Sequence, residues 1–159
     1  MAAVRRNMPP FVRLTCAAMV DALVRDNNLD EAQNIVRNSV RKLQQGDFKM
    51  KELAISAKYT VKKEVAGKKK TLHEQVFERM TQRTGRTFNE GDRVEYVIIQ
   101  HSSVLSSNLL ADRAEDVSHV IANQLCIDIN YYLTVLRRPV KALLKFYMKI
   151  ESLDKLFTN

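Results

Sequence analysis

Three long stretches of the sequence repeat their apolar residues with the spacing of one helix face, and this periodicity constrains the fold most. They span residues 11–25, 29–43 and 129–147. In each stretch, apolar side chains recur three and four positions apart, which predicts an amphipathic helix that buries one side. A chain of 159 residues is long enough to form a core between such helices. The sequence therefore predicts a mainly α fold.

Local signals place the ends of the first two helices. Two consecutive prolines precede the first helix, where proline suits the first turn. Asn28 is suited to cap the second helix, with Glu31 reaching back to its amide, and Gly46 is suited to end it. Because the turn between them is short, the two helices are predicted to form an antiparallel hairpin over residues 9–45.

A small β part is predicted in the middle of the chain. Residues 52–57 alternate weakly between apolar and polar, which indicates a short strand at the start of a basic strand-loop segment, 52–70. Residues 92–100 are rich in β-branched and aromatic side chains, which favour a second strand. The expected β part has two or three strands.

The remaining segments read as helices, about five in the whole chain. Thr71 and Glu74 have the spacing of a capping box, which predicts a helix over residues 71–85. Residues 116–157 are predicted to form the C-terminal helices, with a kink or an interruption at Pro139. All of these elements are assigned to a single domain, residues 1–159.

The charge of the chain is concentrated in one region. The formal net charge is +8, and the segment from Lys58 to Arg86 has nine basic and three acidic residues. Arg79 and Arg83 are four apart and share a helix face. Such a segment suits an anionic partner, either nucleic acid or a membrane surface, although a solvated loop and an ordinary charged helix face explain the charge equally well.

Several function classes are disfavoured. No nucleophile motif, phosphate loop or metal-binding His pair occurs, and the two cysteines, Cys16 and Cys126, are far apart. No apolar run approaches the length of a membrane span. The adjacent acids Glu115 and Asp116 are better explained by the dipole of a following helix than by metal binding. Binding is thus favoured over catalysis by this chain.

The order of motifs, taken together, resembles the thumb region of family B DNA polymerases, the group of polymerase delta and the herpesvirus polymerases. The resemblance covers about residues 4 to 147. Its motifs are Val4-Arg5-Arg6-Asn7, Leu53-Ala54-Ile55-Ser56-Ala57-Lys58, His73-x-x-Val76-x-x-Arg79-Met80-x-x-Arg83, Gly91-Asp92-Arg93-Val94-x-Tyr96-Val97-Ile98, Ala114-Glu115-Asp116 and Ile127-Asp128-x-x-Tyr131-Tyr132-Leu133. The resemblance implies a helical thumb subdomain that grips the phosphates and minor groove of primer–template duplex.

The residues expected to bind DNA come from two sources. The resemblance matches basic positions of the family at Lys58, His73, Arg79, Arg83 and Arg93. Charge alone adds the loop lysines Lys62, Lys63, Lys68, Lys69 and Lys70, which suit phosphate contact without sequence preference. The paired tyrosines also match, but the spacing of Tyr132 favours core packing.

The catalytic motifs of the family are absent. The sequence lacks the palm boxes and the exonuclease carboxylates, so it is interpreted as a thumb piece of a DNA-directed DNA polymerase that is inactive by itself. Mg²⁺ is expected in the palm of the full enzyme and no cofactor in this piece. Expected partners are primer–template duplex, the remaining polymerase domains and a processivity factor, with no membrane.

Departures from the family pattern indicate a divergent member. Leu72 and Val117 stand where the family usually has proline. Such divergence suggests origin in a large DNA virus and an intracellular location, the nucleus or a viral replication site. The alternative function is a basic helical module that binds an acidic protein.

Overall fold

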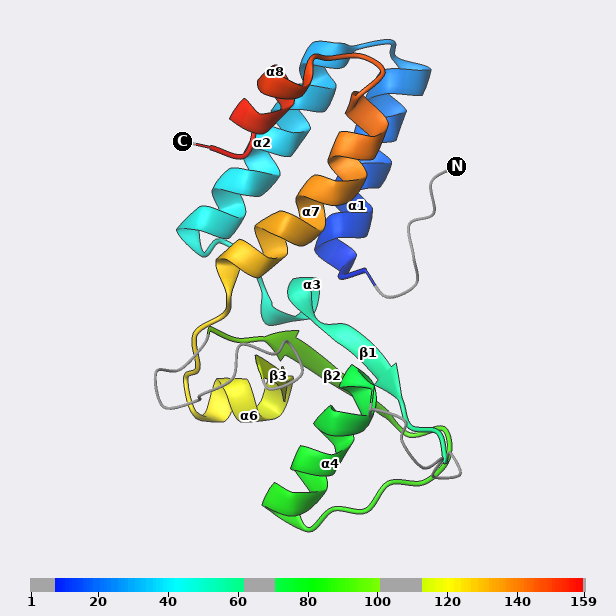
Figure 1. Ribbon diagram of the computed structural model, residues 1–159, viewed down its shortest axis with the longest axis vertical. Helices are drawn as coiled ribbons and strands as arrows, with labels where there is room; N and C mark the ends of the chain where they lie inside the picture. Colours follow the sequence, from blue (N-terminus) through cyan, green and yellow to red (C-terminus); the bar gives the residue numbers. More distant parts are fainter. Residues whose placement is uncertain (1–7, 62–70, 101–112, 159) are drawn as a thin grey trace. The chain divides into compact units, whose positions relative to one another are not determined.

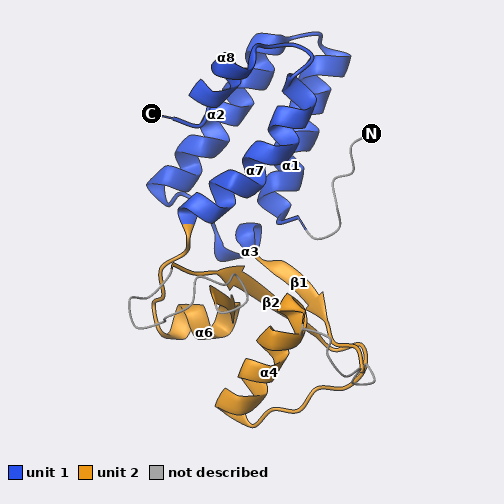
Figure 2. Ribbon diagram, viewed as in Figure 1, with its two compact units in different colours: residues 1–53, 129–159 blue, residues 54–128 orange. Residues whose placement is uncertain are grey.

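The computed structural model describes residues 8–61, 71–100 and 113–158 (Figure 1). In these residues it has seven α-helices, one π-helical turn and a three-stranded antiparallel sheet, which confirms the predicted mainly α fold with a small β part. The chain divides into two compact units, residues 1–53 with 129–159 and residues 54–128 (Figure 2), and the assignment of all elements to a single domain stays a prediction. The second unit is continuous in sequence and has its own sheet and helices.

The first unit begins with the predicted helical hairpin. Helix α1 (Pro10–Val20) continues into a π-helical turn, η1 (Asp21–Arg25), and α2 (Leu29–Gln45) packs against α1. The Asn28 side chain accepts a hydrogen bond from the Glu31 amide at 3.0 Å, which confirms the predicted cap. Helix α2 ends at Gly46, whose φ of 73° is costly for residues with a Cβ, as the sequence predicted.

Three further helices complete this unit: α3 (Met50–Leu53), α7 (Ile129–Leu144) and α8 (Ile150–Lys155). Helix α7 packs against both α1 and α2 and contributes four buried side chains to the core. Of the kink or interruption predicted at Pro139, the interruption does not occur, since α7 runs on to Leu144; the kink stays a prediction. A proline inside a helix costs about 3 kcal/mol, and burial of Leu136, Val140 and Leu144 offsets that cost.

The second unit contains the sheet, with strand order β1-β2-β3. Strand β1 (Ile55–Lys58) starts later than predicted, because α3 already holds the residues up to Leu53. Strand β2 (Arg93–Ile98) lies within the predicted strand 92–100. Strand β3 (Ala114–Asp116) was not predicted, since its three residues carry no alternation that a sequence pattern could detect.

Two helices accompany the sheet. Helix α4 (Leu72–Thr84) has the predicted capping box: the Thr71 hydroxyl accepts from the Glu74 amide at 3.2 Å, and the Glu74 carboxylate accepts from the Thr71 amide at 3.1 Å. Helix α6 (Val117–Ala122) follows β3 directly. An aromatic cluster of Tyr59, Phe77 and Phe88, with ring centroids 4.7–5.8 Å apart, anchors α4 to the chain beyond β1.

Candidate nucleic-acid interface

The two long strands of the second unit have one buried face and one open face. Along β1 and the first four residues of β2, residues alternate between buried and exposed, as a half-buried sheet requires; the last three residues of β2 are all buried. The buried positions are Ile55, Ala57, Val94 and Tyr96, and the exposed positions are Ser56, Lys58, Arg93 and Glu95. We call these four exposed residues the open strand face; it contains two of the predicted DNA-binding residues.

The two cations of the open strand face lie directly opposite each other. Antiparallel pairing of β1 with β2 sets Lys58 across from Arg93 and Ser56 across from Glu95. Like charges at directly opposed positions destabilise a sheet. Within the described part of the chain, no ion pair joins either cation to a carboxylate, and the Arg93 guanidinium only approaches the Ser56 hydroxyl at 3.5 Å. The pair is therefore suited to an external anion.

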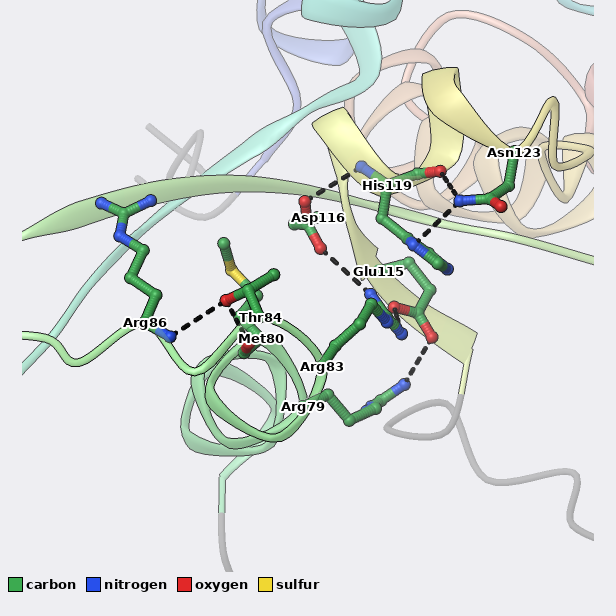
Figure 3. Close-up of polar contacts among 9 residues, drawn as sticks. All are labelled: Arg79, Met80, Arg83, Thr84, Arg86, Glu115, Asp116, His119 and Asn123. Atoms are coloured by element: carbon green, nitrogen blue, oxygen red, sulfur yellow. Dashed lines mark hydrogen bonds and ion pairs between the residues drawn. The ribbon is translucent and has the colours of Figure 1, made fainter.

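The other predicted arginines are held inside the unit by carboxylates (Figure 3). Arg79 donates to Glu115 at 3.1 Å, and Arg83 donates to Glu115 at 3.0 Å and to Asp116 at 3.3 Å. We call these four residues the α4–β3 ion-pair network. The carboxylate side chains are only 11% and 9% exposed, against 23% and 32% for the arginines. The network thus joins α4 to β3 through ion pairs whose carboxylates are largely shielded from water.

Asp116 also connects the network to the next helix. Its second carboxylate oxygen accepts from the His119 amide at 3.0 Å and so caps α6, the role that the sequence predicted for an acid at this point. At the other end of α6, the Asn123 amide group donates to the His119 carbonyl at 2.9 Å. One carboxylate therefore ties α4, β3 and α6 together.

The network gives Arg79 and Arg83 a structural role that the sequence analysis missed. Withdrawing an arginine toward DNA would leave largely buried carboxylates unpaired. The expected cost is about 2–3 kcal/mol, below the about 3–5 kcal/mol of a fully buried pair, because the arginines are partly exposed. The four-residue spacing of the arginines was visible, but their partners lie more than thirty positions away. Contact of these arginines with DNA stays a prediction.

His73 points at a buried partner. Its Nε2 atom lies 3.0 Å from the Tyr96 hydroxyl, and the two rings meet edge to face with centroids 5.3 Å apart. Burial lowers the pKa of His73 from its ordinary value of 6.5, because a charged imidazolium loses hydration there. His73 is therefore neutral at neutral pH and adds no positive charge to the surface.

The remaining predicted residues differ in what the structure says of them. The loop lysines Lys62, Lys63, Lys68, Lys69 and Lys70 lie outside the described residues, so their predicted role stays a prediction. Tyr132 is fully buried, which confirms that it packs in the core. Its neighbour Tyr131 meets it edge to face, with ring centroids 5.1 Å apart.

One further internal ion pair was not foreseen. Arg113 donates to the carboxylate of Asp128, and both side chains are largely buried.

Within residues 8–61, 71–100 and 113–158, no three His, Cys, Asp or Glu side chains are grouped closely enough to hold a metal ion. No helix in the same ranges has the length and apolar character needed to cross a membrane.

Comparison with known proteins gives consistent matches. Residues 1–147 match the family model described as DNA polymerase family B. The chain is 30% identical over 138 residues to a DNA polymerase of Pyramimonas orientalis virus, covering 86% of this chain and 11% of that protein. It is 26% identical over 157 residues to the DNA polymerase delta catalytic subunit of Plasmodium falciparum, covering 98% of this chain and 14% of that protein. The chain thus spans a small part of these relatives.

The fold also matches a solved structure. The family B DNA polymerase of Pyrobaculum calidifontis matches with a TM-score of 0.65 and 19% identity, over 91% of this chain and 18% of that one. At this identity the likeness shows the fold alone, whereas the family model covers most of the sequence. On these matches, the chain belongs to DNA polymerase family B.

Proposed function

We propose that this chain is the thumb part of a DNA-directed DNA polymerase and that it holds primer–template duplex through the phosphate backbone. The observation that carries the proposal is the open strand face, where Lys58 and Arg93 are paired across two strands without a carboxylate partner among the described residues. A rigid sheet that keeps two cations together pre-forms a contact to phosphates. Polymerases of this kind need such sequence-tolerant contacts.

The net charge supports the same proposal at longer range. A chain with net charge +8 attracts DNA from a distance, whatever the base sequence of the DNA. The loop lysines between 62 and 70 extend the basic character next to β1 in the sequence. We place catalysis outside these 159 residues, because the carboxylate boxes that hold Mg²⁺ in this family are absent from the sequence. The palm, not this chain, is proposed to bind Mg²⁺.

The test is a titration of duplex DNA at several salt concentrations. If about six phosphates are neutralised, log affinity falls against log salt with a slope near −5, since each contributes roughly −0.9. The double variant Lys58→Gln/Arg93→Gln should reduce the magnitude of that slope by about 1.8. The matched control is Arg37→Gln/Arg41→Gln, which removes the same charge from exposed positions of α2.

The control separates contact from general attraction. An unchanged slope in the strand variant would contradict the assignment of the open strand face, and so would an equal reduction in the α2 control. Addition of Mg²⁺ and deoxynucleotides should give no primer extension by the purified chain. Extension would contradict the placement of catalysis outside this chain.

A further inference from the structure

The turn between α7 and α8, in the first unit, exposes three large apolar side chains close together in sequence. Phe146 is 79% exposed, Tyr147 50% and Ile150 57%. Two of them are aromatic rings on consecutive residues. We call Phe146, Tyr147 and Ile150, with the lysines around them, the aromatic turn. Exposed large apolar side chains are ordinary when they occur singly, but three within one short segment indicate a binding surface.

The backbone of the aromatic turn is well held. The amides of Tyr147 and Met148 both donate to the Leu144 carbonyl, at 2.9 and 3.0 Å. Leu144 and Leu153, on either side of the turn, are almost completely buried. An ion pair between Arg137 and Asp154 further joins α7 to α8. The rings are therefore presented from a fixed support and lose little conformational freedom on binding.

Positive charge is spaced regularly along the same segment. Lys141, Lys145 and Lys149 recur every four residues, and Glu151 is the acid that follows them. The Lys145 ammonium lies 5.0 Å from the centre of the Phe146 ring, in a cation–π contact. The ammonium therefore stands over one face of the ring, while most of the Phe146 side chain is exposed to solvent. Exposed rings between lysines are the combination that binds single-stranded nucleic acid, with bases on the rings and phosphates on the ammonium groups.

We propose that the aromatic turn binds single-stranded nucleic acid by stacking bases on Phe146 and Tyr147. The choice of DNA as partner rests on the proposed function, but the surface is separate from the open strand face, which belongs to the other unit. A protein partner fits less well, because lysine is depleted in the cores of protein interfaces. A second copy of this chain fits less well still, since each copy carries a net charge of +8.

The test is fluorescence anisotropy of a labelled oligothymidylate with the full 159-residue chain at raised salt, where phosphate contacts weaken and stacking persists. The variant Phe146→Ala/Tyr147→Ala should bind at least about tenfold more weakly, because each stacked base depends on a ring. The variant Phe146→Tyr keeps the ring and should retain affinity. Ile121→Ala, which truncates an apolar side chain that is 60% exposed on α6, is the matched control.

Three results would overturn the proposal, and the first two concern the affinity for oligothymidylate. One is unchanged oligothymidylate affinity in the double alanine variant; the other is an equal loss in the Ile121 control. Polyglutamate that displaces the oligonucleotide equally from the wild type and the double alanine variant would also refute stacking, because the lysines alone would then explain binding. Duplex affinity reports on the proposed function separately: it should depend on Lys58 and Arg93 and not on the aromatic turn.

Discussion

Glu115 is the residue whose replacement tests the α4–β3 ion-pair network most directly. The substitution Glu115→Gln keeps the size of the side chain and removes its charge. Arg79 and Arg83 then both lose the Glu115 carboxylate, while Arg83 keeps its ion pair with Asp116. The effect is therefore a loss of pairing at one defined point, without a cavity and without a change in the strands.

The magnitude follows from how deeply the two sides are buried. Breaking a fully buried pair costs about 3–5 kcal/mol, and an exposed pair contributes at most about 1 kcal/mol. The Glu115 side chain is 11% exposed, but its two arginine partners are 23% and 32% exposed, so solvent screens part of the interaction. An intermediate loss of about 2–3 kcal/mol in the free energy of unfolding is expected.

Urea unfolding at neutral pH measures this loss. The matched control is Glu151→Gln, the same chemical change at an exposed position of α8, where the effect should stay within about 0.5 kcal/mol. A double-mutant cycle with Arg83→Met should give a coupling energy of about 1–2 kcal/mol, because the two residues are in direct contact.

One outcome would contradict a structural role for the α4–β3 ion-pair network. If Glu115→Gln unfolds at the same urea concentration as the wild type and binds duplex more tightly, the network is not structural. The carboxylate would then be withholding Arg79 and Arg83 from phosphate. If the network is structural, duplex affinity in this variant changes only with the small rise in net charge, and the salt slope stays the same.

Two further predictions concern titratable groups. Because burial lowers the pKa of His73, the unfolded chain binds a proton there more readily than the folded chain. The contribution of neutral His73 to the free energy of unfolding is therefore fully present above about pH 6.5 and is lost as the pH falls below that value. The urea midpoints at pH 7.5 and 5.5 should differ less in His73→Gln than in the wild type, and an equal difference would contradict the lowered pKa of His73. Burial also raises the pKa of Cys16 to about 11. An alkylating reagent should therefore label exposed Cys126 far faster than Cys16 in the folded chain, as followed by mass spectrometry. Comparable labelling rates would contradict the packing of Cys16 in the core.

Local chemistry was predictable from the sequence wherever a few neighbouring residues decide it. The caps at Asn28 and Thr71 and the helix end at Gly46 are all as predicted, because each depends on residues within one turn. Strand β3 was not predictable, since its three residues form a strand only by pairing with β2. Such pairing depends on contacts that no local pattern contains.

The candidate site shows the same contrast between what neighbouring residues decide and what long-range contacts decide. Lys58 and Arg93 could each be named from the sequence, but their direct opposition depends on the register of β1 with β2. Likewise, Arg79 and Arg83 could be placed on one helix face, but only the fold brings Glu115 and Asp116 to them. Residue types were predictable, and the neighbours that decide what each residue does were not.

This distinction changes how the basic segment works. Counting charges from Lys58 to Arg86 suggests one continuous cationic surface, yet two of its arginines are paired with acids that lie outside that stretch of sequence. A paired arginine contributes little to the field beyond its own carboxylate and releases no counterion from DNA. Under the proposed function, the remaining contacts with DNA are expected from cations without an internal carboxylate partner. Lys58 meets that condition among the described residues, and so does Arg93, although Arg93 lies outside the segment that the charge count singled out.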